Sequence, residues 1–369
     1  MLAHLLLGWF LWAPQAGTLP DTNPLAMSPE MRAFLDTRVD RGLPPYQRLE
    51  ALVSAVFQDP QLNFSYSTET QTATETFHSR NGNCLSFTIL FIAMARHLNL
   101  DARFREVEIA PTWSKAGSFV NLAQHVNAAV FIGGLAYAID VYPGVNPLEI
   151  GGQVVADARG IAHYFNNKGV DELGYGNFAG AEMYLKKALE LDPETVPVWI
   201  NLGAAKNQAG KLGEAEKYYR KAIELDPRSS AAMSNLANLC DLTGRTKEAA
   251  GYRKKIRQFL EKNPYHHYNL GMQAYEAGRY QEAIARFKKA LRLKSEEHNF
   301  YFAMARAYAQ LDNSEEAVNN LKLAEKYAAD PANKQRYAQK LELLKSIKSP
   351  ASIGSRQLED HPQRLPPAR

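Results

Sequence analysis

A strict 34-residue spacing in the second half of the chain constrains the fold more than any other feature. An alanine recurs at this spacing in five successive units: Ala181, Ala215, Ala249, Ala283 and Ala317. Twelve residues before each alanine stands a small residue: Gly169, Gly203, Ala237, Gly271 and Ala305. Small residues at fixed places let two antiparallel helices approach closely, and repeated helix pairs stack into a solenoid. We therefore predict five helix pairs over residues 161–330.

The second unit carries the most complete version of this pattern. It reads Trp199-x-x-Leu202-Gly203, followed by Gly210, Ala215-x-x-x-Tyr219, Ala222 and Pro227. This pattern resembles the tetratricopeptide repeat nearly position by position. The resemblance implies an all-α solenoid of stacked helix pairs. Apolar positions within 331–348 predict a capping helix after the last unit.

In such a solenoid the first helix of each unit lines a concave face. Polar and aromatic residues fall on these helices at Asn166, Asn207, Asn238, Tyr265, Tyr268, Tyr275 and Arg306. Rings bury apolar side chains while amides bond to a backbone, so the face suits an extended peptide or protein partner. The alternative is that several of these rings pack within the wall of the groove. Cys240, in the third unit, is predicted to be a buried core thiol.

Residues 21–160 lack the 34-residue spacing and predict a separate domain with a helix followed by strands. The stretch Leu85–Leu98 is apolar nearly all round, as expected of a central buried helix. Cys84 stands at its start, directly after the turn-forming and capping residues Asn81-Gly82-Asn83. Backbone N–H groups and the helix dipole favour a thiolate there and would stabilise an oxyanion. The alternative is an inert buried cysteine.

A nucleophilic thiol needs a base, and a downstream hairpin offers one. Apolar runs flank Gly133-Gly134, which is a two-residue turn signal. A symmetric turn sets Asn127 opposite Asp140 and makes His125 a diagonal neighbour of Asp140 on the same face. A slip of one residue in the strand register would place His125 and Asp140 on opposite faces of the sheet. Their spacing about the turn is therefore a specific argument that the two side chains lie on the same face.

With these residues in view, about Arg48 to Pro147 resembles the transglutaminase-like superfamily of papain-like cysteine enzymes. The matching pieces are Gly82-Asn83-Cys84 opening a long apolar helix, residues 96–103 leading into a strand, a strand beginning at His125, and Asp140 on the next strand. The resemblance implies an α+β domain with a central helix packed on an antiparallel sheet. It also implies that Cys84 is the nucleophile, His125 the base and Asp140 the residue that fixes the imidazole tautomer.

Other residues of this region are candidates for supporting roles. Asn83 would support the thiol, and Asn127 either supports the imidazole or substrate or is an ordinary strand residue. Residues 110–124, just before His125, predict a substrate-binding rim. A second oxyanion donor is expected from the segment before Cys84, with three alternatives: Gln61, Tyr66 and Thr68.

These residues together predict an enzyme whose thiol takes an acyl group from a peptide or isopeptide amide. The acyl group passes to water or to an amine, while the repeats recruit a protein partner. Two alternatives stay open: a non-catalytic adaptor whose first domain is a binding module, and an acyltransferase of the same superfamily. No motif indicates a bound nucleotide, flavin or metal, so we expect no cofactor.

Charge and cysteine content exclude several other classes of protein. Forty-three Lys and Arg against 39 Asp and Glu leave a net charge of +4, too mild to indicate nucleic acid or more than peripheral membrane association. Two cysteines cannot build a disulfide framework. The apolar stretch within residues 1–20 has signal-peptide length and favours export, to the periplasm or a membrane surface in a bacterium, over a cytoplasmic location. Residues 349–369 predict a disordered tail, and the oligomeric state is left open.

Overall fold

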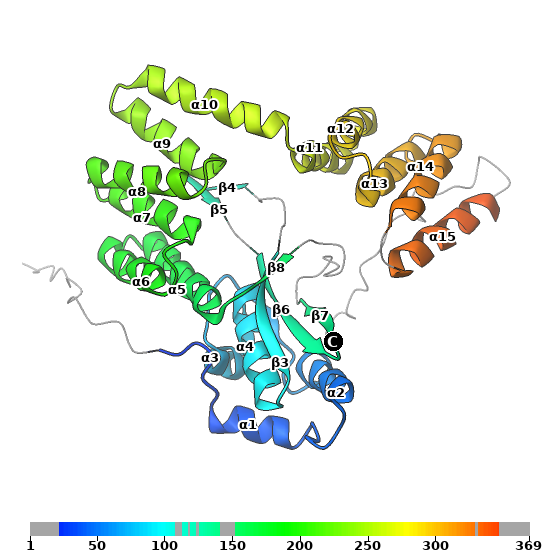
Figure 1. Cartoon of the computed structure of the whole chain (residues 1–369), viewed down its shortest axis with the longest axis horizontal. Helices are drawn as coiled ribbons and strands as arrows, with labels where there is room; N and C mark the ends of the chain where they lie inside the picture. The colour runs from blue at the N-terminus through cyan, green and yellow to red at the C-terminus, as the bar shows by residue number, and fades with distance from the viewer. Residues whose placement is uncertain are drawn as a thin grey trace, which may run out of the picture. The chain divides into compact units, whose positions relative to one another are not determined.

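The computed structural model describes residues 22–107, 113–116, 119–122, 125–140, 152–328 and 331–346. An α/β region with an antiparallel sheet is followed by a helical repeat array (Figure 1). This is the fold class that the sequence predicts. The predicted targeting segment 1–20 and the predicted tail 349–369 lie outside the described residues.

The first region contains four helices, three of which pack around the fourth, buried one. They are α1 (Pro29–Asp36), α2 (Pro45–Phe57), α3 (Ala73–Ser79) and α4 (Cys84–His97). Every residue of α4 from Leu85 to Ala95 is buried, and α1, α2 and α3 all contact this helix. The predicted central helix is therefore confirmed. It is hydrophobic all round because it is covered on all sides.

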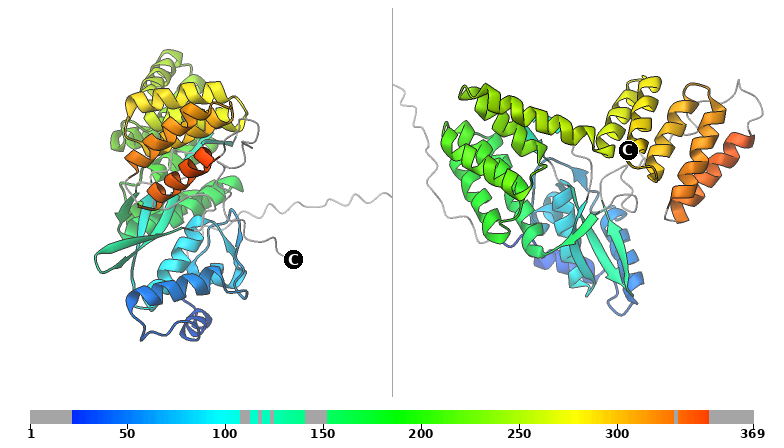
Figure 2. Two further views of the ribbon diagram at one scale, coloured as in Figure 1. Left: turned by 90° about the vertical axis from the view of Figure 1, so that its right-hand side faces the viewer. Right: turned by 45° about the horizontal axis from the view of Figure 1, so that its top comes forward.

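A four-stranded sheet with the order β7-β6-β3-β8 lies beside α4, as Figure 2 shows from two further directions. Its strands are β3 (Asp101–Val107), β6 (His125–Ile132), β7 (Leu135–Ile139) and β8 (Gly152–Val155). Gly133 and Gly134 join β6 to β7 with φ of +60° and +83°. Positive φ at both turn residues matches the twist of the strands in a two-residue hairpin, and glycine adopts it readily. The two glycines therefore allow the tight turn that pairs β6 with β7.

Two smaller strand pairs complete the first region. β1 (Ser65–Tyr66) pairs in parallel with β2 (Asn81–Gly82), directly before α4. β4 (Trp113–Ala116) and β5 (Phe119–Leu122) form an antiparallel pair within the predicted rim, residues 110–124. The other residues of that rim lie outside the described residues.

The repeat region consists of five helix pairs and a final helix. The pairs are α5 (Asp157–Gly174) with α6 (Phe178–Leu191), α7 (Val196–Gln208) with α8 (Leu212–Leu225), α9 (Ser230–Leu242) with α10 (Thr246–Glu261), α11 (Pro264–Glu276) with α12 (Tyr280–Leu293), and α13 (His298–Ala309) with α14 (Ser314–Tyr327). The final helix is α15 (Pro331–Ser346), which lies within the residues 331–348 where the sequence predicts a cap.

The small residues of the 34-residue pattern let the two helices of a unit touch. A Cβ added to Gly203 would stand 2.4 Å from the Tyr219 ring, and one added to Gly271 would stand 2.4 Å from the Phe287 ring. The third unit differs, since Arg253 occupies the position of these rings and donates to the Asp241 carboxylate at 2.5 Å. This unit therefore lacks the aromatic contact that packs the second and fourth units.

The first repeat helix is built into the α/β region. Arg96, near the end of α4, forms two hydrogen bonds with the Asp157 carboxylate, at 2.6 and 2.7 Å. One turn further along α5, a Cβ added to Gly160 would stand 2.3 Å from the Phe104 ring of β3. Helix α5 thus begins four residues before the predicted unit boundary at residue 161, because its first turn is anchored to α4 and β3.

A partly buried carboxylate on α5 gives a pH-dependent stability. Burial raises the pKa of Asp171, and the nearby Glu69 carboxylate acts in the same direction, whereas Lys168 and the Thr70 backbone N–H lower it. A pKa raised on folding means that the folded state holds the proton more tightly than the unfolded state does. The free energy of unfolding therefore falls as the pH rises from below the aspartate pKa of the unfolded chain to above that of the folded protein. Asp171→Asn is therefore expected to raise the free energy of unfolding at pH 7, by less than about 1 kcal/mol.

Urea unfolding of both proteins at pH 7 and at pH 3 measures this effect. Below the ordinary aspartate pKa of about 3.9 the carboxyl is protonated in both states, so the two proteins are expected to converge there. A difference of the same size at both pH values would show that the charge of Asp171 is not its cause.

Candidate active site

The Cys84 thiol stands at the first turn of α4 and is partly exposed. The Asn83 side chain caps this helix by accepting a hydrogen bond from the Ser86 backbone N–H at 3.0 Å. A Cβ added to Gly82 would stand 2.6 Å from the Ser86 Cβ, so the approach to the helix requires glycine. The helix start thus presents the thiol beside the backbone N–H groups of its first turn, where negative charge is favoured.

The segment that follows β1 is held next to this helix start. The Asn83 side-chain amide donates to the Thr68 carbonyl oxygen at 3.3 Å and to the Thr70 hydroxyl at 2.6 Å. The Ser67 backbone N–H donates to the Gly82 carbonyl oxygen at 2.9 Å. These bonds fix residues 67–70 beside the residue that immediately precedes the thiol.

The three candidate oxyanion donors occupy different surroundings. The Gln61 side chain accepts a hydrogen bond from Arg38 at 2.7 Å, in the turn before β1. Tyr66 is 62% exposed at the end of β1. Thr68 is bonded through its carbonyl to Asn83. Of the three, Thr68 is the one that the described hydrogen bonds tie to the residue beside Cys84.

The structure brings His125 and Asp140 together. His125 Nε2 lies 2.5 Å from Asp140 Oδ2, and the two side chains are 10% and 1% exposed. His125 opens β6, and Asp140 directly follows β7, across the hairpin that Gly133 and Gly134 close. A carboxylate buried this deeply needs a hydrogen-bond donor, and the imidazole supplies one.

One hydroxyl joins the helix that bears the thiol to the strand that begins with His125. Thr88 Oγ1 lies 2.8 Å from the Cys84 carbonyl oxygen and 3.0 Å from the Val126 carbonyl oxygen. Val126 is the residue after His125. The first turn of α4 is therefore held against the start of β6.

Asn127 is buried within β6, with 1% of its surface exposed. Its side-chain oxygen accepts a hydrogen bond from Arg105 on β3 at 3.4 Å. This bond links neighbouring strands of the sheet, which is the contact expected of a strand residue.

The residues predicted for the peptide groove fall into two groups. Asn166 is 6% exposed and accepts a hydrogen bond from the Asn201 side chain at 2.8 Å. Tyr275 is 9% exposed and lies beneath the Arg306 guanidinium, 4.7 Å from ring centroid to cation. Both contacts belong to the wall of the array. Partly or largely accessible side chains form the other group, which comprises Asn207, Asn238, Tyr265 and Tyr268.

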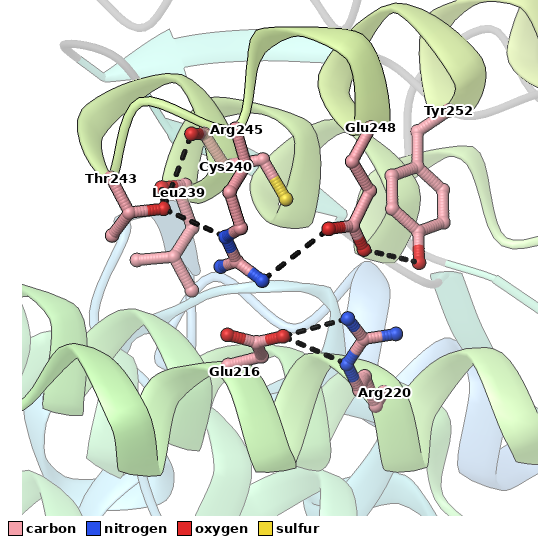
Figure 3. A network of polar contacts seen from close by, with 8 residues as sticks. All are labelled: Glu216, Arg220, Leu239, Cys240, Thr243, Arg245, Glu248 and Tyr252. Atoms are coloured by element: carbon pink, nitrogen blue, oxygen red, sulfur yellow. Dashed lines mark hydrogen bonds and ion pairs between the residues drawn. The ribbon is translucent and has the colours of Figure 1, made fainter.

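Cys240 is fully buried in α9, which confirms the prediction of a core thiol. Figure 3 shows the polar contacts that follow it along the chain. The Thr243 hydroxyl donates to the Leu239 carbonyl oxygen at 3.0 Å, and Arg245 Nε donates to the same hydroxyl at 3.0 Å. Arg245 also forms an ion pair with Glu248 at 3.4 Å. These bonds stabilise the turn between α9 and α10.

One polar residue of the repeats was missed by sequence reasoning. Asn235 on α9 is 2% exposed, and neither atom of its amide has a hydrogen-bond partner among the described residues. A signal for it exists, because asparagines recur at the 34-residue spacing at Asn167, Asn201, Asn235 and Asn269.

The described residues contain neither a cluster of metal-ligand side chains nor a helix that could cross a membrane. No three His, Cys, Asp or Glu side chains in the described part of the chain are grouped as metal ligands. Within the same residues, no helix has the length and apolar character needed to cross a membrane.

Family models match both parts of the chain. Residues 33–139 match the transglutaminase-like superfamily. Residues 196–229, 218–250 and 298–331 match tetratricopeptide repeat models, and residues 271–312 match a further TPR model. No curated protein matches the chain in sequence.

Several solved structures are similar to the repeat array. A crystal structure of MamA protein is 23% identical and covers 45% of this chain and 91% of its own, with a TM-score of 0.25. The structure titled "Crystal structure of YrrB: a TPR protein with an unusual peptide-binding site" is 20% identical and covers 49% and 92%, also with a TM-score of 0.25.

Proposed function

The chain contains a transglutaminase-like domain followed by tetratricopeptide repeats, and from this combination we propose a thiol-dependent enzyme that transfers acyl groups from peptide or isopeptide amides. The observation that carries the proposal is the buried 2.5 Å pair of His125 Nε2 and Asp140 Oδ2. Such a pair orients an imidazole as a base, and Cys84 at a capped helix start is the nucleophile that it would serve.

Proton transfer prepares the thiol for attack. With Nε2–H donated to Asp140, the basic nitrogen of the neutral imidazole is Nδ1. Nδ1 takes the proton of Cys84, and the Asp140 carboxylate stabilises the imidazolium that results. The dipole of α4 stabilises the thiolate at the same time.

The acyl group is then transferred in two steps. The Cys84 sulfur bonds to the amide carbon, and the C–N bond breaks as the His125 imidazolium protonates the leaving amine. Water or a second amine next loses a proton to His125 and attacks the thioester carbon, which releases the thiol. Backbone N–H groups at the start of α4 and a group from residues 67–70 are suited to stabilising the oxyanion of each tetrahedral intermediate.

The tetratricopeptide repeats support a protein-interaction role. In this proposal they recruit the protein that carries the amide. The accessible side chains Asn207, Asn238, Tyr265 and Tyr268 are the candidates for contacting it.

The two cysteines allow a direct test of the thiol. In native protein, iodoacetamide is expected to alkylate Cys84 at least tenfold faster than Cys240, which is fully buried. Cys84 would react faster than Cys240 through its greater exposure alone. The decisive comparison is therefore between the Cys84 alkylation rates of the unaltered protein and of His125→Asn, which lacks the base. This change is expected to lower the Cys84 rate at pH 7 about tenfold or more, because the thiolate is the reactive form and the variant has no imidazole to take the thiol proton. Peptide mapping by mass spectrometry measures both rates.

Two outcomes would contradict the enzyme. One is a Cys84 rate that does not change with His125→Asn, and the other is full function of Cys84→Ser, which would favour a non-catalytic adaptor. Incubation with a glutamine peptide and a dansylated amine tests amide chemistry. Incubation with an acyl thioester and an arylamine tests the acyltransferase alternative.

Capture with Cys84→Ala as a trap, followed by mass spectrometry, identifies candidate substrates. If the same species are captured after deletion of the repeats from residue 196 onward, the repeats do not recruit them.

A further inference from the structure

The second helices of the repeat units differ in charge. Helix α6 has two Lys or Arg and two Glu, and α8 has three of each, so both are neutral overall. Helix α10 has five Lys or Arg against two Glu, and α12 has four against one. With nine cations and three anions these two helices carry a net charge of +6, whereas the whole chain has a net charge of +4. The mild charge of the chain therefore conceals two strongly basic helices.

A pair of adjacent cations recurs at the 34-residue spacing in the first four second helices. The pairs are Lys186-Lys187, Arg220-Lys221, Lys254-Lys255 and Lys288-Lys289. In the first unit, Lys186 Nζ lies 2.8 Å from Glu182 Oε1 and Lys187 Nζ lies 3.0 Å from Glu190 Oε2. One glutamate stands four residues before its cation and the other stands three residues after, on the same side of the helix. Both cations of the first unit are thus neutralised within their own helix.

The second unit repeats both contacts. Arg220 Nη2 lies 2.7 Å from Glu216 Oε1, as Figure 3 shows, and Lys221 Nζ lies 2.7 Å from Glu224 Oε1. The surface of α8 at this position is therefore balanced in charge, as that of α6 is.

The third and fourth units have the cations but not these glutamates. Ala250 and Gln258 stand at the two glutamate positions of the third unit. Ile284 and Arg292 stand at those of the fourth unit, so that one anion position holds a further cation. Like charges four residues apart on a helix, as in Lys288 and Arg292, repel each other. An anion bound from outside the chain would relieve this repulsion.

Six exposed cations of α10 and α12 have no carboxylate partner among the described residues, and we call them the basic stripe. They are Lys247, Lys254, Lys255, Arg257, Lys288 and Arg292. Two other cations of these helices do have such partners, since Arg253 pairs with Asp241 and Lys289 with Glu261. The charges of the basic stripe are therefore available to an external ligand.

The cations on α10 lie on the side of the helix that faces away from the array. Ala249 is the only buried residue of α10, and it lies about 160° around the helix axis from Lys247. Lys254 lies within about 20° of Lys247, and Lys255 and Arg257 lie about 80° to either side of it. The four cations thus share the outer side of α10.

The surroundings of the basic stripe favour a lipid surface over a protein or nucleic-acid partner. No large hydrophobic side chain of α10 is exposed, and on α12 Leu293, beside Arg292, is 44% exposed. Specific protein interfaces depend on buried aromatic or apolar anchors, and single-stranded nucleic acids stack on exposed rings. An anionic bilayer instead attracts Lys and Arg by charge alone, and each cation near the surface strengthens binding about fivefold.

We propose that α10 and α12 form a docking surface for an anionic lipid bilayer, with the basic stripe contacting the headgroups. The contact is peripheral, since no helix of the described residues could cross a membrane. The side chains proposed above to contact a protein partner lie on α7, α9 and α11, not on these two helices. The docking surface is therefore separate from the residues proposed for protein recruitment, and it does not depend on any activity of Cys84.

Cosedimentation of the full chain with lipid vesicles tests the docking surface. At low salt the chain is expected to bind vesicles containing about 30% phosphatidylglycerol at least tenfold more tightly than vesicles of phosphatidylcholine alone. Raising the salt to about 0.5 M is expected to remove most of this difference, because it screens the charges. The neutral vesicles measure all binding that does not depend on lipid charge. Equal binding to both kinds of vesicle at low salt would overturn the proposal.

The repeats provide a matched pair of variants. Lys254→Gln together with Lys255→Gln is expected to weaken binding to the anionic vesicles about 25-fold, since two cations are lost. Arg220→Gln together with Lys221→Gln removes the equivalent pair of the second unit, which glutamates already neutralise, and is expected to change binding less than about threefold. An equal loss in both double variants would show that binding follows the net charge of the chain and would overturn the assignment to α10.

A second double variant adds carboxylates and keeps every cation. Ala250→Glu together with Gln258→Glu supplies the two partners that α6 and α8 possess, and is expected to weaken binding to the anionic vesicles at least tenfold. The midpoint of urea unfolding is expected to stay the same or to rise, because the added pairs stabilise an exposed helix. Unchanged vesicle binding in this variant would overturn the role of the unpaired cations.

A short DNA duplex and poly-glutamate test the two other classes of anion. If either one binds the unaltered chain more tightly than the anionic vesicles do, and loses affinity with Lys254→Gln and Lys255→Gln, the assignment to lipid is wrong. Alkylation of Cys84 without vesicles is expected to be the same in all these variants, so the vesicle results stand apart from the test of the thiol.

Discussion

Replacing Asp140 with alanine is expected to slow the inactivation of the protein by a peptidyl thiol-reactive inhibitor by roughly 10³-fold. The Asp140 carboxylate is 1% exposed and lies 2.5 Å from His125 Nε2. Its removal leaves the imidazole without the group that orients it and that stabilises its charged form. The second-order rate constant for loss of the free Cys84 thiol measures the effect.

Asp140→Asn separates orientation from charge. The asparagine oxygen still accepts a hydrogen bond from His125 Nε2–H, but it no longer stabilises the imidazolium as a carboxylate does. We expect an intermediate rate and a reduced dependence of the rate on pH, because the thiolate–imidazolium pair is less favoured. Rates for both variants within twofold of the unaltered protein, with unfolding midpoints unchanged, would show that Asp140 does not act through His125.

Gly160→Ala is expected to destabilise the chain by about 2–3 kcal/mol. The change normally favours a helix by about 1 kcal/mol, because alanine has the higher helix propensity. At this site, however, the new Cβ would stand 2.3 Å from the Phe104 ring on β3, so α5 and the sheet must move apart. Urea unfolding followed by circular dichroism gives the free energy.

Gly251→Ala is the matched control for this experiment. Gly251 lies within α10, and no atom stands within 4 Å of the Cβ that alanine would add. We expect a gain of about 1 kcal/mol from helix propensity alone. A gain in both variants would mean that α5 is not packed tightly on the α/β region.

Features of the fold that depend on residues close in the chain, or on a repeated spacing, could be predicted from the sequence alone. The spacing of Ala181, Ala215 and their equivalents predicts the helix pairs, because each pair depends on contacts at fixed sequence separations. The glycines at 133 and 134 predict the turn, and its register predicts that His125 and Asp140 lie near each other. The start of α4 at Cys84 follows from the capping side chain of Asn83.

Contacts between residues far apart in the chain could not be predicted from the sequence. No sequence pattern indicates that Arg96 binds Asp157 across 61 residues or that Gly160 faces Phe104. Helix α5 begins at Asp157, four residues before the predicted unit boundary at residue 161, and its first turn takes part in those contacts. The sequence also did not indicate which of the predicted groove residues are accessible. In the structure Asn166 and Tyr275 are buried, whereas Tyr265 is 38% exposed.

The sequence by itself determined the two kinds of structure, an α/β region and a helical repeat array. These depend on periodicity, turn chemistry and helix capping, which act between residues close in the chain. The tertiary structure decided that β5 contacts α9 and that Asn235 is buried with no hydrogen-bond partner among the described residues. The first is a contact between segments more than 100 residues apart in the chain, and its energy depends on shape and on solvent exclusion that only the folded chain creates.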